Sequence, residues 1–121
     1  MPEVFTTFAS SRFVDRGAVI AALHECAERL KAQEPEAIAV YLFGSFAGGT
    51  ATPHSDADVV VEVASEEPAL RERVWQAAFT AFLDAPVPVD LFVLSSAQLA
   101  EGMHTQKGVA GTVAREGVRL R

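Results

Sequence analysis

The chain has 121 residues, of which half are hydrophobic and 21% are charged. This length and balance predict one compact domain over residues 1–121, rather than two small cores or a disordered segment. The formal net charge of −6 disfavours a broad phosphate-binding surface, which needs clustered Lys and Arg, so DNA and RNA are not expected as substrates. A basic protein partner or a small cationic acceptor would suit this charge better.

The sequence contains one cysteine, Cys26, which excludes an internal disulfide and a cysteine-based zinc cluster. The first ten residues lack a basic flank and a continuous apolar core, and no later apolar run approaches the roughly 20 residues that span a bilayer. We therefore expect a soluble protein of the reducing cytoplasm with no membrane partner. Homo-oligomers and hetero-oligomers both remain open.

Apolar residues at spacings of three and four predict an amphipathic helix from Asp15 to Gln33, with Asp15 as its cap and Pro35 just beyond its end. The next run, residues 37–43, is short and almost wholly apolar. It predicts a buried strand that stops at Gly44.

Residues 44–55 are rich in glycine and small hydroxyl residues, which predicts a loop with one helical turn after Ser45. The β-branched run at 57–63 predicts a second strand. A second helix is expected over residues 66–83, with Ser65 as its cap, because apolar residues again recur at helical spacing.

A third strand is predicted over residues 87–94, with Pro88 at its beginning or on a sheet edge. Ser95 and Gln98 form a predicted capping box for a following helix. Glycines interrupt the tail from 98 to 121, which predicts short helices and a final extended piece.

This order of elements predicts an α/β or α+β domain, in which a small mixed β-sheet is flanked by helices. Three further residues, Cys26, Tyr41 and Trp75, lie in apolar patterns and are expected in the core.

Asp56 and Asp58 are the first candidate chemical residues. Residues two apart on a strand point to the same face, so the two carboxylates would lie side by side. Adjacent anions repel, and unless one is protonated a hard divalent cation with oxygen ligands is the common solution, which favours Mg²⁺. Glu62 falls on the same face and is a reserve ligand, although a solvated glutamate is the simpler interpretation.

Gly44 and Ser45 are the second candidate feature. Glycine lets the backbone bend and approach a ligand closely, and exposed N–H groups with the Ser45 hydroxyl could hold phosphate oxygens. An Asp-x-Asp triplet or a Gly-Ser turn alone is weak evidence. Together they supply the two parts that nucleotidyl transfer needs, orientation of a triphosphate and neutralisation of its charge.

The stretch from Gly44 to Gly49, followed by Ser55 to Asp58, resembles the signature of the DNA polymerase beta-like nucleotidyltransferases. The similarity covers residues 37–94 and is greatest to the minimal nucleotidyltransferase (MNT) domains, those of antitoxin type among them. It implies the nucleotidyltransferase fold, with ATP as substrate and two Mg²⁺ ions as cofactors.

The resemblance also implies roles for individual residues. Asp90 matches the family's third carboxylate in type and context, and the alternative is a solvated carboxylate at a strand edge. By this similarity Asp56 and Asp58 bind both metals, whereas Asp90 binds one and helps to deprotonate the acceptor hydroxyl. Gly44 and Ser45 would hold the nucleotide phosphates.

The sequence departs from the family pattern at Gly48, where many similar sequences have arginine, so a cation near the triphosphate is missing. Arg12, Arg16 and Lys107 are candidates to replace it. His54 could touch the nucleotide, although an exposed loop histidine is the simpler interpretation. Ser55 is expected to cap the following strand or turn the chain into it, with contact to phosphate as the alternative.

Three functions are compatible with these residues. The leading one follows from the resemblance to MNT antitoxins: AMP is transferred from ATP to a tyrosine hydroxyl on a HEPN-type toxin partner, with release of pyrophosphate. The second is a non-catalytic antitoxin that neutralises its partner by binding. The third is a small-molecule nucleotidyltransferase similar to enzymes that modify aminoglycosides.

Overall fold

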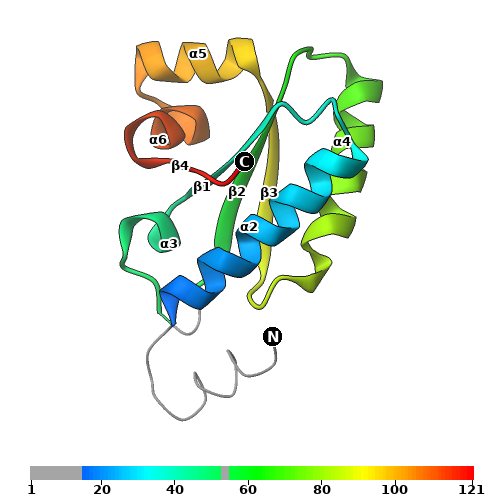
Figure 1. Cartoon of the computed structure of the whole chain (residues 1–121). Helices are drawn as coiled ribbons and strands as arrows, with labels where there is room; N and C mark the ends of the chain where they lie inside the picture. Colours follow the sequence, from blue (N-terminus) through cyan, green and yellow to red (C-terminus); the bar gives the residue numbers. More distant parts are fainter. Residues whose placement is uncertain (1–14, 53–54) are drawn as a thin grey trace.

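The computed structural model describes residues 15–52 and 55–121. In this part of the chain, a four-stranded mixed sheet has the order β3-β2-β1-β4 and is flanked by helices (Figure 1). The strands are β1 (Ala39–Phe43), β2 (Ala57–Val63), β3 (Val89–Ser95) and β4 (Val118–Arg119). The helices are α2 (Arg16–Gln33), α3 (Ser45–Gly48), α4 (Pro68–Ala81), the 3₁₀ helix η1 (Phe82–Asp84), α5 (Ser96–Thr105) and α6 (Gly108–Glu116). The predicted fold class is therefore confirmed.

Helix α2 begins where the sequence predicts. The Asp15 carboxylate accepts a hydrogen bond of 3.0 Å from the backbone N–H of Ala18, which satisfies one of the free N–H groups of the first turn. The helix ends at Gln33, and Glu34 is already extended. No helix in the described ranges is long and apolar enough to cross a membrane.

Strands β1 and β2 are antiparallel, whereas β2 and β3 are parallel and joined by a crossover through α4. The predicted bounds of β2 are confirmed, but β1 begins two residues later than expected. Strand β3 also begins two residues late, at Val89. Pro88 has no N–H group to donate to a neighbouring strand. Its carbonyl oxygen accepts a hydrogen bond of 2.8 Å from Ala57 N.

Helix α4 is shorter than predicted and has a different cap. It begins at Pro68, and its N-cap is Glu67 rather than Ser65. The Ser65 hydroxyl instead accepts a 3.1 Å bond from Glu67 N and shapes the turn before the helix. Proline at the first helical position needs no N–H partner and has a φ suited to the helix, which fixes the start there.

The two faces of the sheet are covered differently. Valines at 59, 61 and 63 of β2 belong to the main core under α2 and α4. The alternate residue Val60 belongs to a smaller core that includes Phe43 and Val113 of α6. In Figure 1, α5 and α6 cover one end of this second face, and α3 lies at the other end.

Trp75 is not a core residue, contrary to the prediction. It is 36% exposed and stacks on Phe79, itself 46% exposed, with ring centroids 5.3 Å apart. The apolar surface of α4 is wider than the area that the sheet covers, since Val74 and Ala78 already fill the inward side. Of the other predicted core residues, Cys26 is buried, whereas Tyr41 is only half-buried.

The capping box predicted at the start of α5 is present. Gln98 N donates to the Ser95 hydroxyl at 3.0 Å, and Ser95 N donates to the Gln98 side-chain oxygen at 2.9 Å. The tail beyond it forms two short helices and the final strand β4, as the spacing of its glycines predicts.

Candidate functional site

Strand pairing brings Asp58 and Asp90 together. The parallel register of β2 and β3 places Asp58 directly opposite Asp90, and the antiparallel register of β1 and β2 places Asp58 opposite Phe43. Adjacent strands lie about 4.8 Å apart, and paired residues point to the same face. Asp56 lies two residues ahead of Asp58, just before β2, with its side chain exposed.

Gly44 connects the loop to this carboxylate pair. Its backbone has φ 77° and ψ −152°, a combination open almost only to glycine. A Cβ atom at this position would overlap the Oδ2 atom of Asp58. The sequence predicted a close backbone approach to a ligand, and the structure shows that the close neighbour is the Asp58 carboxylate itself. The glycine motif and the aspartate motif therefore belong to one site.

The loop then makes the single helical turn that the sequence predicts, α3. Phe46 is fully buried and anchors this turn to the core. Gly48 N donates a hydrogen bond of 3.0 Å to Gly44 O, which closes the turn. Ser45 is half-buried, and in the described residues its hydroxyl has no hydrogen-bond partner. The first N–H groups of a helix have no acceptor within the helix, so this end of α3 can donate to an anion.

The site concentrates negative charge. Burial raises the pKa of Asp58, and the neighbouring charges of Asp90 and Asp56 raise it further. In residues 15–52 and 55–121, none of these three carboxylates forms an ion pair or a hydrogen bond. Such a cluster is complementary to a cation.

The cation that these carboxylates could hold is Mg²⁺. Among the described side chains, no three His, Cys, Asp or Glu groups converge as in a complete metal centre. Mg²⁺, however, is commonly held by one or two carboxylates and completes its octahedron with substrate phosphates and water. Asp58 and Asp90, with Asp56 beside them, provide hard oxygen donors without competing partners. This donor set fits the ion.

Comparison with known proteins identifies the family. Residues 23–109 match the family model described as Nucleotidyltransferase domain. The chain belongs to this family. A solved structure from Sulfolobus solfataricus, designated a candidate nucleotidyltransferase, is similar with a TM-score of 0.60 and 18% identity, over 86% of this chain and 80% of that one.

A second solved structure, of a toxin-antitoxin with AMP-PNP, is similar with a TM-score of 0.54 and 24% identity, over 81% of this chain and 72% of that one. At these identities the two structures establish the fold of this nucleotidyltransferase domain, which agrees with the family match. No curated protein matches the chain.

Glu62, the reserve ligand, has a different environment in this nucleotidyltransferase. It accepts hydrogen bonds from the Ser96 hydroxyl at 2.6 Å and from the Tyr41 hydroxyl at 3.3 Å. It thereby joins β1, β2 and the start of α5, at the other end of β2 from Asp58. Its carboxylate is structural here, a role that its position in the sequence alone did not reveal.

Two loop residues were also assigned from the sequence. The Ser55 hydroxyl accepts a 2.8 Å bond from Thr52 N, which supports the predicted role of Ser55 in the turn before β2. His54 lies outside the described residues.

The three cations that could replace the missing arginine at position 48 differ in their positions. Arg16 donates from Nε to Phe46 O at 2.6 Å and from Nη2 to Ala47 O at 2.9 Å, so its guanidinium is bound to the α3 backbone. Lys107 is exposed and precedes α6, and Arg12 lies outside the described residues. Gly48 is exposed, with open space where a side chain would begin.

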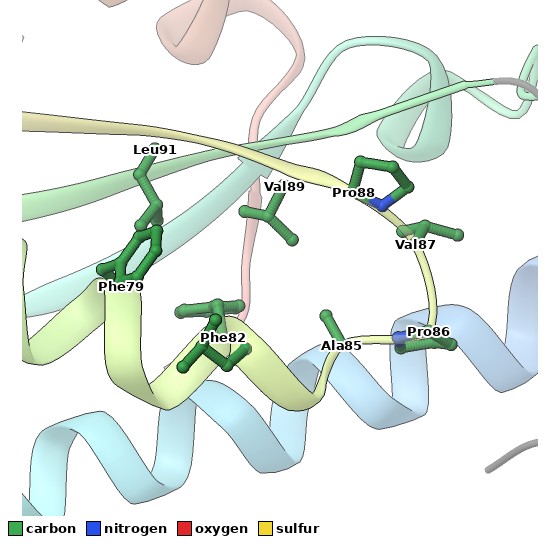
Figure 2. A pocket seen from close by; sticks show the side chains of 9 residues that line it. Phe79, Phe82, Ala85, Pro86, Val87, Pro88, Val89 and Leu91 are labelled. Atoms are coloured by element: carbon green, nitrogen blue, oxygen red, sulfur yellow. The ribbon is translucent and has the colours of Figure 1, made fainter.

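An apolar pocket of about 360 Å³ lies between α4, η1 and the start of β3 (Figure 2). All of its lining side chains are hydrophobic: Phe79, Phe82, Leu83, Ala85, Pro86, Val87, Pro88, Val89 and Leu91. Val89 and Leu91 point to the opposite face of β3 from Asp90, because side chains alternate along a strand. With no charged or hydroxyl side chain, this pocket does not suit a triphosphate.

Proposed function

We propose that this domain is a Mg²⁺-dependent nucleotidyltransferase that transfers AMP from ATP to a tyrosine hydroxyl of a HEPN-type toxin protein. The observation that carries the proposal is the position of Asp58, between Asp90 and Gly44 and without a neutralising partner in the described residues. Family membership supports the class of reaction. The likeness to the toxin-antitoxin with AMP-PNP supports the choice of partner and nucleotide.

In this proposal Asp56 and Asp58 bind two Mg²⁺ ions, and Asp90 binds one of them. The bound ions would compensate the charge that develops on the triphosphate. Gly44 and Ser45 hold the phosphates through backbone N–H groups and the Ser45 hydroxyl. Asp90 accepts the proton from the tyrosine hydroxyl, whose oxygen forms the new bond to the α-phosphorus, and the bond to pyrophosphate breaks in line.

A protein acceptor suits the charge of the domain better than a nucleic acid does. The net charge is −6, and the candidate site adds three unpaired carboxylates within the described part of the chain. A polyanionic acceptor would be repelled, whereas a toxin with a basic RNA-binding surface would be attracted.

The test first establishes whether the adjacent gene encodes a HEPN-type protein, and then combines that protein with the purified chain. Incubation with Mg²⁺ and ATP should increase the intact mass of the partner by one or more AMP groups and reduce its ribonuclease activity. Peptide mapping should place the group on tyrosine. Asp58→Asn should abolish the mass change while the two proteins still associate. An unmodified partner across a panel of nucleotides and divalent ions would overturn the proposal.

A second candidate function is neutralisation of the toxin by binding alone, with the nucleotide only as a ligand. Gly48 favours this alternative, because the loop of residues 44–50 lacks the cation that similar sequences place there. The double variant Asp56→Asn with Asp58→Asn separates the two. If it still neutralises the toxin in cells, binding suffices; if it forms the complex without protecting cells, catalysis is required.

A further inference from the structure

Arg16 links the first turn of α2 to the end of α3, although thirty residues separate it from Phe46. Its Nε and Nη2 atoms donate to two consecutive carbonyls, those of Phe46 and Ala47, at 2.6 and 2.9 Å. We infer that Arg16 is a positioning residue for the nucleotide phosphates. It would act by fixing the loop of residues 44–50, called the α3 loop below. This inference rests on the proposed function, in which that loop binds the triphosphate.

The α3 loop needs support from elsewhere in the chain. A helix of four residues is too short to be stable alone, and its last carbonyls have no partner within the helix. The buried ring of Phe46 fixes one side of the turn. The planar guanidinium of Arg16 adds a second support, because two hydrogen bonds from one rigid group define both position and orientation.

The two supports together set the direction of the phosphate-facing groups. Gly44 and Ser45 precede the carbonyls that Arg16 holds by less than one helical turn, so a shift of those carbonyls moves the Ser45 hydroxyl and the first N–H groups. Binding a flexible triphosphate to a fixed loop avoids the entropy cost of ordering the loop at the same time.

Arg16 also places a positive charge where the loop has none of its own. The end of α3 carries partial negative charge on its carbonyls, and Gly48 provides no side chain to offset it. The guanidinium of Arg16 offsets this partial charge through its two hydrogen bonds. Since its Nε and Nη2 groups are occupied by the backbone, the residue acts mainly through the loop rather than by contact with the nucleotide.

The same helix offers a matched control. Arg29 also donates from its guanidinium to a backbone carbonyl, that of Ala81 at 3.1 Å, and it pairs with Asp84 at 3.5 Å. These contacts hold the end of α4 and the 3₁₀ helix η1, and do not involve the α3 loop. Arg29→Gln therefore removes a comparable side-chain contact of α2 while leaving the loop intact.

The experiment compares Arg16→Gln, Arg16→Lys and Arg29→Gln in the full chain. MgATP affinity is measured by calorimetry, and binding of Mn²⁺ alone, which reports on the strand carboxylates, by electron paramagnetic resonance. We expect Arg16→Gln to weaken MgATP binding about tenfold, the cost of one or two charge-assisted hydrogen bonds. Arg16→Lys should recover part of this loss, and Arg29→Gln should stay within about twofold of the wild type.

Mn²⁺ binding should be unchanged in all three variants, because Asp58 and Asp90 are held by strands rather than by the loop. The inference is overturned if wild-type protein binds MgATP and Arg16→Gln binds it no more weakly than Arg29→Gln does. It is also overturned if Arg16→Gln loses Mn²⁺ and MgATP affinity in parallel, which would indicate general unfolding. Failure of the wild type to bind MgATP at all would instead contradict the proposed function.

Discussion

Replacing Gly44 with alanine tests whether the glycine and aspartate motifs form one site. Gly44 has a φ of 77° and a ψ of −152°, which costs a residue with a Cβ atom about 1–3 kcal/mol in strain. The new methyl group would also overlap the Asp58 carboxylate, so either the backbone or Asp58 must move. We expect Gly44→Ala to lower the free energy of unfolding by about 2–4 kcal/mol, at the upper end of common single substitutions.

The assay is urea unfolding followed by circular dichroism, with Mg²⁺ affinity measured on the folded variant. Gly48→Ala is the control, because Gly48 belongs to the same loop but has an ordinary φ and open space for a Cβ atom. As a glycine inside a short helix, it should tolerate alanine with a change of about 0 to 1 kcal/mol towards greater stability. If Gly44→Ala is as stable as Gly48→Ala and keeps its Mg²⁺ affinity, the close contact with Asp58 is not a constraint on the site.

Three further predictions follow from single residues. Burial raises the pKa of Asp58 above its ordinary value of 3.8, and the charges of Asp90 and Asp56 raise it further. The stability that protonated Asp58 contributes is therefore present at low pH and is lost as pH rises through the raised pKa. Asp58→Asn should therefore stabilise the protein in EDTA at pH 7 by up to about 1 kcal/mol after allowance for solvent screening, and should not do so at pH 3, as urea unfolding would show. Gly48→Arg should fold normally and bind MgATP about fivefold more tightly in calorimetry, since it adds a charge-assisted donor at an open position. Burial also raises the pKa of the Cys26 thiol, so a thiol reagent should label Cys26 slowly in native protein and rapidly in denaturant; fast labelling of folded protein would contradict its burial.

Local signals in the sequence predicted most elements. The Asp15 cap, the bounds of β2 and the Ser95–Gln98 capping box depend on residues within a few positions of one another, and all three are present. The nucleotidyltransferase fold was predicted from the glycine and aspartate motifs, and the family match confirms it. The assignment of individual metal ligands stays a prediction.

The sequence missed features that depend on distant partners. The bonds from Arg16 to α3 and from Tyr41 to Glu62 cross thirty and twenty-one residues, and no periodicity encodes such pairs. The exposure of Trp75 was missed for a related reason. Helical spacing shows that a helix has a wide apolar surface, but not how much of that surface the neighbouring sheet can cover.

The hydrophobic core determines where the candidate site forms. In β3, Val89, Leu91 and Val93 pack towards the main core, so the alternation of side chains turns Asp90 to the opposite face. A slip of one residue between β2 and β3 would put Asp58 opposite Val89 or Leu91 and separate the two carboxylates. If the slip also turned β3 over, Asp90 would face the core and three apolar side chains would face outwards. Burying that charge and exposing those side chains would cost several kcal/mol. The register that holds Asp58 against Asp90, despite their repulsion, is therefore imposed by the valines and leucine on the other side of the sheet. Burial of apolar residues thus offsets the electrostatic cost of assembling a site that a cation can then occupy.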